Sequence, residues 1–575
     1  MKMTRLSVKI LCTLMALGVE LLPVFAQEPC VRYPQGSIVA EPENLYSTNR
    51  VLQVDFTYQT SENDYGQTLY CFVNSDGAQS PTLHVHPGDT LILTLTNLVP
   101  EQPGKAGRMA DMPEMELSKA GIEGCGAMSM TASSVNIHYH GTNTPPICHQ
   151  DEVIRTIINS GETFRYELHI PDKEPPGLYW YHPHIHGIAT AAVQGGASGA
   201  IIVEGIENVN PKVAGLPQRV LIVRDTPPVN PPPIKTRTRN HPLDIEPATD
   251  LSVNYIPVGG PAYIPAVLTM KPNEKQFWRV VNSAAVTILD LQLRYDGELQ
   301  PFEVIALDGV PIGSQEGSGK GQSLIRTNLL IPPAGRAEFI VNGPSDQVNK
   351  ALFLTHQVYT GPGGDSDPTR PLFTIDVSQS GAAAPGVTTV PAVSGPPPAE
   401  RFAGLANAKA ITKRRLYFSE NDTYFFITVE GQRPKPYHMD DPPAIVTTQG
   451  SVEEWKIENR SNENHEFHMH QIHFLLLARN GVPVSAEDRQ ILDTVNIPYW
   501  SGTGPYPSVT LRMDFRGPDI GDFVYHCHIL DHEDGGMMAI IRVLPPDATA
   551  ISKNSKPKIP IEASRAATGR MSAKD

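Results

Sequence analysis

The sequence predicts an all-β protein made of three consecutive Greek-key β-sandwich domains. The main observation is a fifteen-residue pattern of strand, turn and alternating strand that ends in Asn each time, at residues 83–97, 268–282 and 445–459. The copies begin 185 residues (83 to 268) and 177 residues (268 to 445) apart, which is far longer than a solenoid repeat. The 575 residues also include 54 Pro and 46 Gly, as is typical of short strands joined by turns.

The chain divides in order into six predicted segments. These are a signal peptide (1–26), a first sandwich (27–205), a second sandwich (206–378), a linker (379–410), a third sandwich (411–545) and a disordered tail (546–575). The linker is rich in Ala, Gly and Pro, and the tail is polar with scattered basic residues. The length of the chain is consistent with about three or four domains of ~150 residues.

The first residues are typical of a secretory signal. Lys2, Arg5 and Lys9 precede an apolar run, and Ala26 is a small residue suited to cleavage. The alternative is a membrane anchor, but the run is shorter than the ~20 residues of a span, and Glu20 interrupts it. We therefore expect an exported protein without a membrane span, located in the periplasm or outside the cell.

Charge and cysteine content agree with this interpretation. The net charge of -15 argues against a nucleic-acid partner. Besides Cys12 in the signal and Cys527 in a motif described below, four cysteines remain, compatible with two disulfides in an oxidising compartment. Three pairings are possible. Proximity along the chain favours Cys30–Cys71 and Cys125–Cys148.

Residues 524–537 (VYHCHILDHEDGGM) bring together a thiol, three imidazoles and a thioether. In a strand, Cys527 points to one face, and His526 and His528 point to the other, roughly 6.6 Å apart. That spacing suits two metals that share a small molecule. On the Cys527 side, two His, one Cys and a weak axial Met are the ligands of a blue-copper electron-transfer site.

Three further histidine groups occur upstream, at residues 138–140, 182–184 and 465–470. Together the four groups contain ten of the 19 histidines. A single His-x-His is weak evidence, but four such groups of soft and borderline ligands indicate bound metal. His84 and His86 form another His-x-His. Their counterparts in the other two copies of the repeat are not ligand types, so we interpret this pair as a strand face.

The four groups, in this order, resemble the multicopper oxidases, which include laccases, cuprous oxidases, bilirubin oxidases and ferroxidases. The resemblance covers about residues 83–543. It implies cupredoxin domains and four copper ions, with ligands from the first and third domains and none from the second. By position in the motifs it assigns His465, Cys527, His532 and Met537 to the type 1 copper, His138 and His468 to the type 2 copper, and His140, His182, His184, His470, His526 and His528 to the type 3 pair.

The resemblance implies an enzyme, an oxidase that takes single electrons from a small-molecule reducing substrate at type 1 and reduces dioxygen to water at the other three coppers. We expect a laccase-like monomer acting on phenols or aromatic amines. The alternative is a metal-ion oxidase for Cu(I), Fe(II) or Mn(II), because thioethers are soft ligands for Cu(I). A methionine cluster raises that alternative, although it can equally be loop packing: Met109, Met112, Met115, Met128 and Met130.

Non-enzymatic members of the fold have lost their ligands, whereas this sequence retains all ten histidines and Cys527. A simple electron carrier would need no three-copper cluster. Copper nitrite reductases share the domain type, but they usually have two domains and lack this full ligand set.

Two carboxylates are candidate proton relays for the reduction of dioxygen. Glu533 follows the ligand His532, as in the bacterial cuprous oxidases, and Asp151 lies eleven residues beyond His140. Glu152 is a rival for Asp151, because the family's acid falls slightly earlier. The competing interpretation of each acid is a solvated loop carboxylate.

Two residues depart from many laccases. Glu466 stands where those enzymes have Pro, and Met537 stands where many fungal laccases have Leu or Phe, which predicts a lower type 1 potential. His186 and His473 each extend a motif by one alternation. Either can hydrogen-bond to a metal-ligand side chain or have a structural or solvent-facing role.

Overall fold

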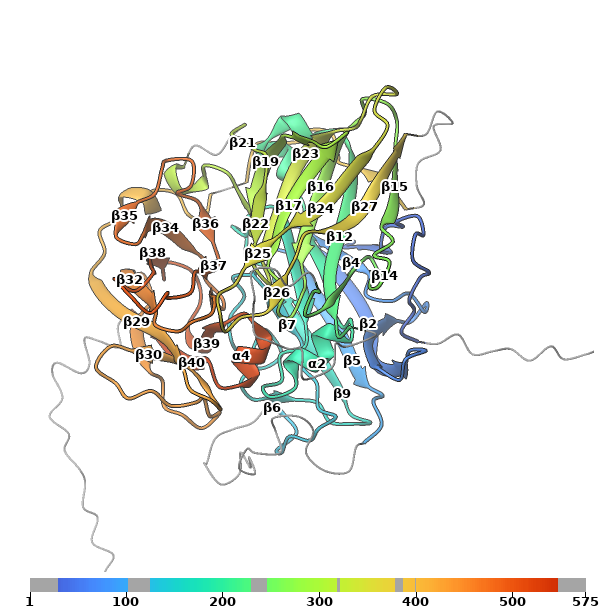
Figure 1. Ribbon diagram of the computed structural model, residues 1–575. Helices are drawn as coiled ribbons and strands as arrows, with labels where there is room; N and C mark the ends of the chain where they lie inside the picture. Colours follow the sequence, from blue (N-terminus) through green and yellow to red (C-terminus); the bar gives the residue numbers. More distant parts are fainter. Residues whose placement is uncertain are drawn as a thin grey trace, which may run out of the picture.

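The computed structural model describes residues 29–101, 125–228, 246–317, 321–377, 386–398 and 400–546. The expected signal peptide, the tail beyond residue 546 and Met109, Met112 and Met115 lie outside these residues. The described strands form three successive sandwiches, each of two facing sheets (Figure 1). This confirms the predicted all-β fold class.

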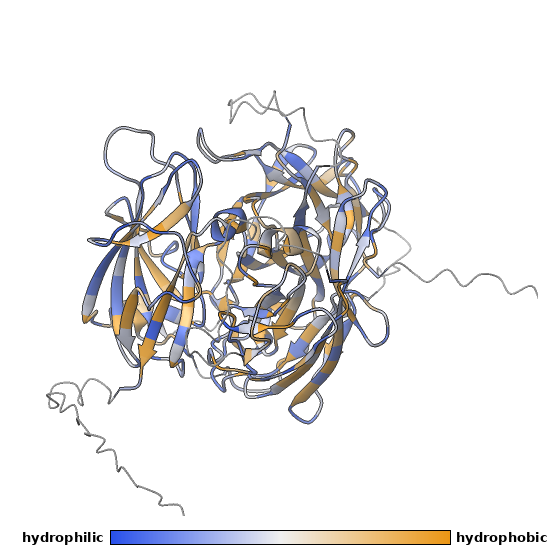
Figure 2. Cartoon of the chain, turned by 90° about the horizontal axis from the view of Figure 1, so that it is seen from below, coloured by the Kyte–Doolittle hydropathy of each residue, from blue (hydrophilic) through white to orange (hydrophobic). Residues whose placement is uncertain are grey.

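The first sandwich pairs a five-stranded sheet with a four-stranded sheet. In sheet order the first consists of β1 (Asn44–Tyr46), β4 (Thr82–Val85), β11 (Gly199–Val203), β10 (Gly177–His182) and β7 (His138–His140). The second consists of β3 (Thr68–Asn74), β2 (Val51–Glu62), β5 (Thr90–Asn97) and β9 (Thr163–His169). Alternate residues of β2 and β5 are buried, which is the period-two pattern of a strand with one face on the core, and Figure 2 shows this alternation of polar and apolar residues along strands.

The second sandwich is the largest. Its nine-stranded sheet consists of β14 (Ile256–Val258), β13 (Asp250–Val253), β12 (Pro217–Thr226), β16 (Lys275–Asn282), β23 (Arg336–Asn342), β19 (Phe302–Leu307), β20 (Val310–Pro311), β21 (Leu324–Arg326) and β28 (Thr388–Thr389). Its six-stranded sheet consists of β15 (Ala266–Met270), β27 (Arg370–Val377), β24 (Ala351–His356), β17 (Leu289–Tyr295), β18 (Glu298–Gln300) and β22 (Leu329–Ile331). Trp278 is fully buried in the core between these sheets, with Phe353 and Phe373 around it.

The third sandwich pairs a seven-stranded with a five-stranded sheet. The larger consists of β30 (Phe425–Val429), β29 (Thr412–Glu420), β32 (Val452–Asn459), β38 (Ser508–Asp514), β34 (Phe474–Arg479), β35 (Val482–Pro483) and β36 (Ile491–Leu492). The smaller consists of β31 (Ile445–Thr448), β40 (Met538–Leu544), β39 (Gly521–Cys527), β33 (His465–Met469) and β37 (Thr494–Ile497). Strands β39 and β33 are neighbours, so two of the four histidine motifs lie side by side in this sheet.

The remaining elements are short. They are α2 (Ala189–Gln194), α3 (Ile206–Val209), α4 (Leu530–Asp534), the pair β6 (Cys125–Gly126) and β8 (Thr156–Ile157), the pair β25 (Val358–Tyr359) and β26 (Ser366–Asp367), and 3-10 turns at Pro211–Val213, Ser314–Glu316 and Leu405–Asn407. None of the helices in the described part of the chain is long and apolar enough to cross a membrane.

The fifteen-residue repeat has the same structure in all three sandwiches. Its first strand (β4, β15 or β31) lies in one sheet and its second (β5, β16 or β32) lies in the facing sheet. The final Asn of each copy is fully buried: Asn97, Asn282 and Asn459. Each side chain donates to two or more backbone carbonyls, and its oxygen accepts from the backbone N–H two residues on. The repeated Asn therefore satisfies the backbone where the chain leaves the strand.

The sandwiches meet where the histidine motifs lie. Ala189 and Val193 of α2 pack against Leu530 of α4, with Ala285 of the second sandwich completing this apolar contact. Asp534 strengthens the junction, because its carboxylate accepts from the N–H groups of Gly187 and Thr190 at 2.7 and 2.9 Å. The two disulfides are Cys30–Cys71 and Cys125–Cys148, as chain proximity predicted.

The domain boundaries stay predictions, and two features of the structure bear on them. Val39, assigned to the first domain, packs in the core of the second sandwich. Strand β28 lies within the expected linker and pairs with β12. The segments that connect the sandwiches are therefore partly packed onto them.

Candidate metal centres

Strand β39 ends in the thiol and imidazoles on which the site is built. His526 pairs with Met538 of β40 and with His468 of β33, which fixes the register of the strand on both sides. The rings of His526 and His528 lie 5.3 Å apart between centroids. The Cys527 thiol contacts a different set of histidines, as expected for alternate residues of one strand.

One group of ligand atoms surrounds Cys527. The Nδ1 atoms of His465 and His532 each lie 3.7 Å from its Sγ and 3.0 Å from each other. The Nε2 atoms point away from this group: Ser461 Oγ lies 2.6 Å from that of His465, and Glu463 Oε1 lies 3.3 Å from that of His532. The two Nδ1 lone pairs and the sulfur can therefore face one ion.

Met537 is held beside this group by the backbone. Its N–H donates to the carbonyl of His532 at 2.9 Å, and its carbonyl accepts from the N–H of Cys527 at 3.0 Å. Its side chain is fully buried in the same core cluster as Cys527. Burial raises the pKa of the Cys527 thiol well above its ordinary value, so a metal cation is the natural means of stabilising a thiolate here.

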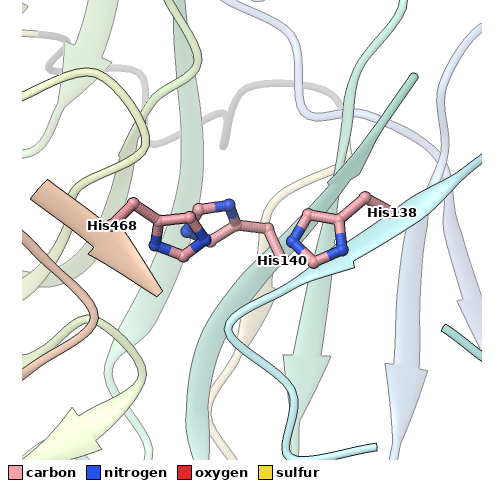
Figure 3. Close-up of side chains that lie close together, drawn as sticks. All are labelled: His138, His140 and His468. Carbon is pink, nitrogen blue, oxygen red and sulfur yellow. The ribbon is translucent and has the colours of Figure 1, made fainter. Parts of the chain in front are cut away.

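The other eight motif histidines form one buried cluster between the first and third sandwiches. Three compact groups can be distinguished, with ligand atoms within 4.8 Å of one another in each: His140, His182 and His528; His184, His470 and His526; and His138, His140 and His468. The first two groups divide the six residues predicted for the type 3 pair into two sets of three. Figure 3 shows the third group, with His138 and His468 approaching from opposite sides and His140 between them.

Several of these rings are oriented by a hydrogen bond to the ring nitrogen that points away from the cluster. His138 Nδ1 lies 3.0 Å from Asp151 Oδ1, His182 Nδ1 2.9 Å from the Pro183 carbonyl, and His468 Nδ1 2.8 Å from the Asp493 carbonyl. In each case Nε2 is buried without a hydrogen-bond partner in the described structure. His140 is turned the other way: Nε2 lies 3.4 Å from Asp493 Oδ1, and Nδ1 is the nitrogen without a partner.

The second of these groups presents its ring nitrogens to one another. The Nε2 atoms of His184, His470 and His526 lie 3.1 to 3.3 Å apart. Burial lowers the pKa of all eight histidines, so the imidazoles are neutral, which is the form that binds metal. Buried neutral imidazoles with unpartnered nitrogens are costly without a ligand. This donor set fits copper, for which imidazole and thiolate are suitable ligands.

Both candidate acids are buried against the cluster, so neither is a solvated loop carboxylate. Asp151 accepts from the backbone N–H of Tyr139 at 3.0 Å and from Gln471 Nε2 at 2.6 Å, in addition to its contact with His138. Glu533 Oε1 lies 3.8 Å from His184 Nδ1. Burial raises the pKa of both carboxyl groups well above their ordinary values.

The rival Glu152 does not reach the cluster. Its carboxylate accepts from the backbone N–H of Arg155 and from Thr156 Oγ1 at 3.0 Å. Glu466, which stands where many laccases have Pro, accepts a hydrogen bond from Asn496 Nδ2 at 2.7 Å. Burial raises the pKa of Glu466 to about 8.

Sequence reasoning missed an ion pair that spans the second and third sandwiches. Arg336, the first residue of β23, donates from Nη1 to Asp493 Oδ1 at 2.7 Å, and its Nη2 lies 2.7 Å from Asp493 Oδ2. Asp308 Oδ1 lies 3.7 Å from the same guanidinium and accepts from the backbone N–H of Arg336 at 2.9 Å. All three side chains are buried. Arg336 belongs to no motif and gave no sequence signal. Asp493 gave one, because it is a charged residue within an apolar strand region.

His186 and His473, the histidines that extend two of the motifs, have different surroundings. His473 Nε2 lies 3.0 Å from the Asp308 carbonyl and 3.6 Å from Asp493 Oδ2, so it supports the ion pair. His186 packs its ring edge-on against Tyr437 at 4.9 Å. His84, from the remaining His-x-His, is buried between Glu204 and Asn44 at 2.6 and 2.7 Å, as expected for a residue of the fold.

Comparison with known families agrees with this geometry. Two models, both described as multicopper oxidase, match residues 129–208 and 410–547. These segments carry all four histidine motifs.

The chain belongs to the multicopper oxidase family.

Its sequence identity to individual members is low, but the similarity extends over about two thirds of the chain or more. The multicopper oxidase mco of Staphylococcus haemolyticus is 23% identical over 394 residues, covering 67% of this chain and 72% of that protein. A laccase of Bacillus subtilis is 23% identical over 459 residues, covering 71% and 80%. This multicopper oxidase is therefore an oxidoreductase that uses dioxygen and a reducing substrate, and its family implies bound copper ions.

Solved structures show the same fold. A variant of the multicopper oxidase McoA from Aquifex aeolicus superposes with a TM-score of 0.62 at 19% identity, covering 88% of this chain and 99% of that one. A multicopper oxidase from Campylobacter jejuni, described as a metallo-oxidase, superposes with a TM-score of 0.61 at 20% identity, covering 89% and 96%.

Proposed function

We propose that this multicopper oxidase is an exported laccase-like enzyme that oxidises phenols or aromatic amines one electron at a time. The observation that carries the proposal is the His532–Glu463 pair of the Cys527 centre, whose side chains are 9% and 11% exposed, together with the aromatic residues packed around it. The two disulfides are consistent with export to an oxidising compartment. We keep the monomer of the sequence prediction as part of the proposal.

Four copper ions complete the proposed enzyme. His465, Cys527, His532 and Met537 hold the type 1 ion. His138 and His468 hold the type 2 ion, and the sets His140, His182, His528 and His184, His470, His526 each hold one ion of the type 3 pair. Bound copper supplies one-electron transfer from the substrate and the four-electron reduction of dioxygen to water. The chain itself joins the two centres, because Cys527 lies between His526 and His528.

The proposed entry point for electrons is the imidazole of His532. Its side chain is 9% exposed, whereas the His465 ring is fully buried. The Glu463 carboxylate faces His532 Nε2 at 3.3 Å and is placed to accept the proton that a phenol loses on oxidation. Phe425 stacks on the His532 ring at 4.3 Å, which gives the entry point an aromatic wall.

Aromatic residues from two sandwiches lie beside Asn464, the residue between Glu463 and His465 in the chain. The backbone N–H of Asn464 donates to the carbonyl of Thr360 at 2.7 Å, and Asn464 Oδ1 accepts from the N–H of Tyr499 at 2.9 Å. The ring of Tyr499 packs edge-on against Tyr359, which is 38% exposed, at 5.4 Å. Through Tyr499, this pair of tyrosines contacts Asn464, which directly precedes His465 in the chain. Such an aromatic rim favours flat aromatic substrates over hydrated metal ions.

Asp151 and Glu533 are the proposed proton carriers. Glu533 Oε1 and Oε2 lie 3.8 and 3.7 Å from His184 Nδ1 and His526 Nδ1, with no hydrogen-bond partner elsewhere in the described structure. Asp151 contacts the cluster through His138. Each carboxyl group can therefore hold a proton beside the space in which dioxygen is reduced.

The second candidate is oxidation of metal ions, with Cu(I), Fe(II) or Mn(II) as substrate. It is favoured by the methionine cluster of the sequence, of which Met128 and Met130 are described, and by the description of the Campylobacter jejuni relative as a metallo-oxidase. A direct test is oxygen consumption by copper-loaded protein with a phenol, Cu(I) and Fe(II) in parallel. Efficient turnover of a metal ion with negligible turnover of phenols would reject the laccase-like proposal.

Glu463→Gln tests the entry point itself. The proposal expects kcat/KM for phenols to fall at least ten-fold, with unchanged blue colour and copper content. Glu430→Gln is the matched control, because Glu430 is an exposed carboxylate of the same sandwich paired with Arg460. Unchanged phenol oxidation in Glu463→Gln would remove this carboxylate from the mechanism.

A further inference from the structure

A small cavity of about 10 Å³ lies directly beside the histidine cluster. Its polar and sulfur-containing walls are Met130, His184, His186, Tyr437, Met439 and Met538, and the remaining wall is Val and Ile side chains. Met130, His184 and His186 come from the first sandwich, whereas Tyr437, Met439 and Met538 come from the third. The cavity is therefore formed only when the two sandwiches that carry the copper motifs pack together.

The donors around this cavity are soft. Three methionines line the cavity, and two of them, Met439 and Met538, are only 6% and 5% exposed. His186 adds an imidazole; the residue is 6% exposed, and its Nδ1 has no hydrogen-bond partner within the described ranges. One buried imidazole nitrogen without a partner and three methionine side chains that line the same cavity form an incomplete set of contacts that a ligand can satisfy.

The chemistry of the donors selects the ligand. A cavity of this size holds one small particle at most, and a water molecule would need two to four polar partners. Thioethers are weak hydrogen-bond acceptors, so they bind water poorly. Thioether and imidazole are instead preferred by Cu(I), a soft monovalent ion, over Mg²⁺, Ca²⁺ or Mn²⁺.

The cavity lies next to proposed ligands of the three-copper cluster. Met538 is directly opposite His526 in the β39–β40 register, so the two side chains share a face of the sheet. His184, a proposed type 3 ligand, is itself part of the wall. The electron-entry residues His465, Cys527 and His532 do not line the cavity.

We propose that this cavity is a Cu(I)-binding site, separate from the four catalytic coppers, that holds an ion next to the three-copper cluster. The site is a holding site for copper that enters the cluster, not the place where the reducing substrate is oxidised. Part of the predicted methionine cluster is thereby explained: Met130 lines the site, whereas Met128 is 48% exposed and does not.

Ag(I) is the probe for this proposal, because it prefers the same soft donors and does not reduce the bound copper. Copper-loaded protein is titrated with Ag(I) by calorimetry, and the product is examined by X-ray absorption at the silver edge. We expect one Ag(I) per chain with sulfur neighbours, and an affinity at least ten-fold lower in Met130→Leu and in Met439→Leu. Met270→Leu, a buried methionine in the core of the second sandwich, is the matched control and should bind Ag(I) as the unmodified protein does.

Three outcomes decide the proposal. Loss of one Ag(I) equivalent in Met130→Leu and Met439→Leu, with phenol oxidation within two-fold of the unmodified protein, supports it independently of the substrate of the enzyme. Unchanged Ag(I) binding in both variants overturns it and leaves the methionines as packing. Silver without sulfur neighbours also overturns it. As a second readout, full-length protein stripped of copper and refilled with Cu(I) under nitrogen should regain its three-copper cluster more slowly in both variants, and equal refilling rates reject the holding role.

Discussion

Replacement of Arg336 by Met tests whether the second sandwich, which contributes none of the proposed copper ligands, organises the histidine cluster. The guanidinium makes contacts of 2.7 Å with both oxygens of Asp493 and lies 3.7 Å from Asp308. Burial by itself would raise the pKa of Asp493, but Arg336, with His473, holds that pKa below its ordinary value. Burial and the neighbouring Asp493 charge raise the pKa of Asp308, because two carboxylates share one guanidinium.

The magnitude follows from this geometry. At 2.7 Å and an effective dielectric constant of about 20, the Coulomb attraction of one charge pair is about 6 kcal/mol before the cost of desolvation. Breaking a buried pair by removing one partner typically costs about 3–5 kcal/mol, since the other charge stays buried without compensation. We therefore expect Arg336→Met to lower the free energy of unfolding by about 3–5 kcal/mol, which corresponds to a Tm lower by about 6–20 °C for a sandwich of about 150–250 residues that unfolds as one unit.

Copper binding separates this role from general destabilisation. Asp493 also contacts His140 Nε2 and so helps to keep His140 Nδ1 directed at the cluster. Loss of such a supporting contact typically costs about 10–100-fold in metal affinity. Arg336→Met should therefore release copper from the cluster at lower chelator concentrations, while the blue colour of the Cys527 centre persists.

The matched control is Arg219→Met. Arg219 is as buried as Arg336 and pairs with Glu41 at 3.1 Å in the second sandwich, but it does not contact the histidine cluster. It should show a comparable loss of stability with unchanged copper affinity. Equal copper affinities in all three proteins, or a loss of stability below about 1 kcal/mol in Arg336→Met, would refute the reasoning.

Three further predictions follow from single residues. Cys527→Ser should remove the blue colour and nearly all oxidation of external substrates while other copper stays bound, and a blue variant would contradict the ligand assignment. Asp151→Asn and Glu533→Gln should keep colour and copper content and fast reduction by substrate, but they should slow reoxidation by dioxygen in stopped-flow experiments, more so at high pH; unchanged reoxidation in both variants and in the double variant would reject the proton relay. Burial raises the pKa of Glu174 to about 7, so the folded state binds its proton more tightly than the unfolded chain, and stability falls as the pH rises from about 4.5 to 7. Glu174→Gln should therefore raise the Tm relative to the unmodified protein above pH 7 but not at pH 4.5, and a Tm difference independent of pH would show that Glu174 is not the cause.

Much of the candidate copper site follows from the sequence because its proposed ligands lie at fixed short spacings. Alternation along one strand places His526 and Cys527 on different faces whatever the rest of the fold does. The repeat likewise determines three sandwiches, since each copy provides one strand to each of two facing sheets. Both disulfides also join cysteines that are close along the chain.

Other features depend on residues far apart in sequence, and tertiary structure alone decides them. The division of six histidines into two sets of three depends on how the first and third sandwiches dock. The sequence left Asp151 and Glu152 as rivals, and the packing of their loop turned Asp151 towards His138 and Glu152 towards Arg155. Arg336 and Asp493 are 157 residues apart and belong to no common motif, so their ion pair had no local signal. Sequence pattern specifies what one strand presents, whereas the contacts between sandwiches depend on docked surfaces that no local spacing encodes.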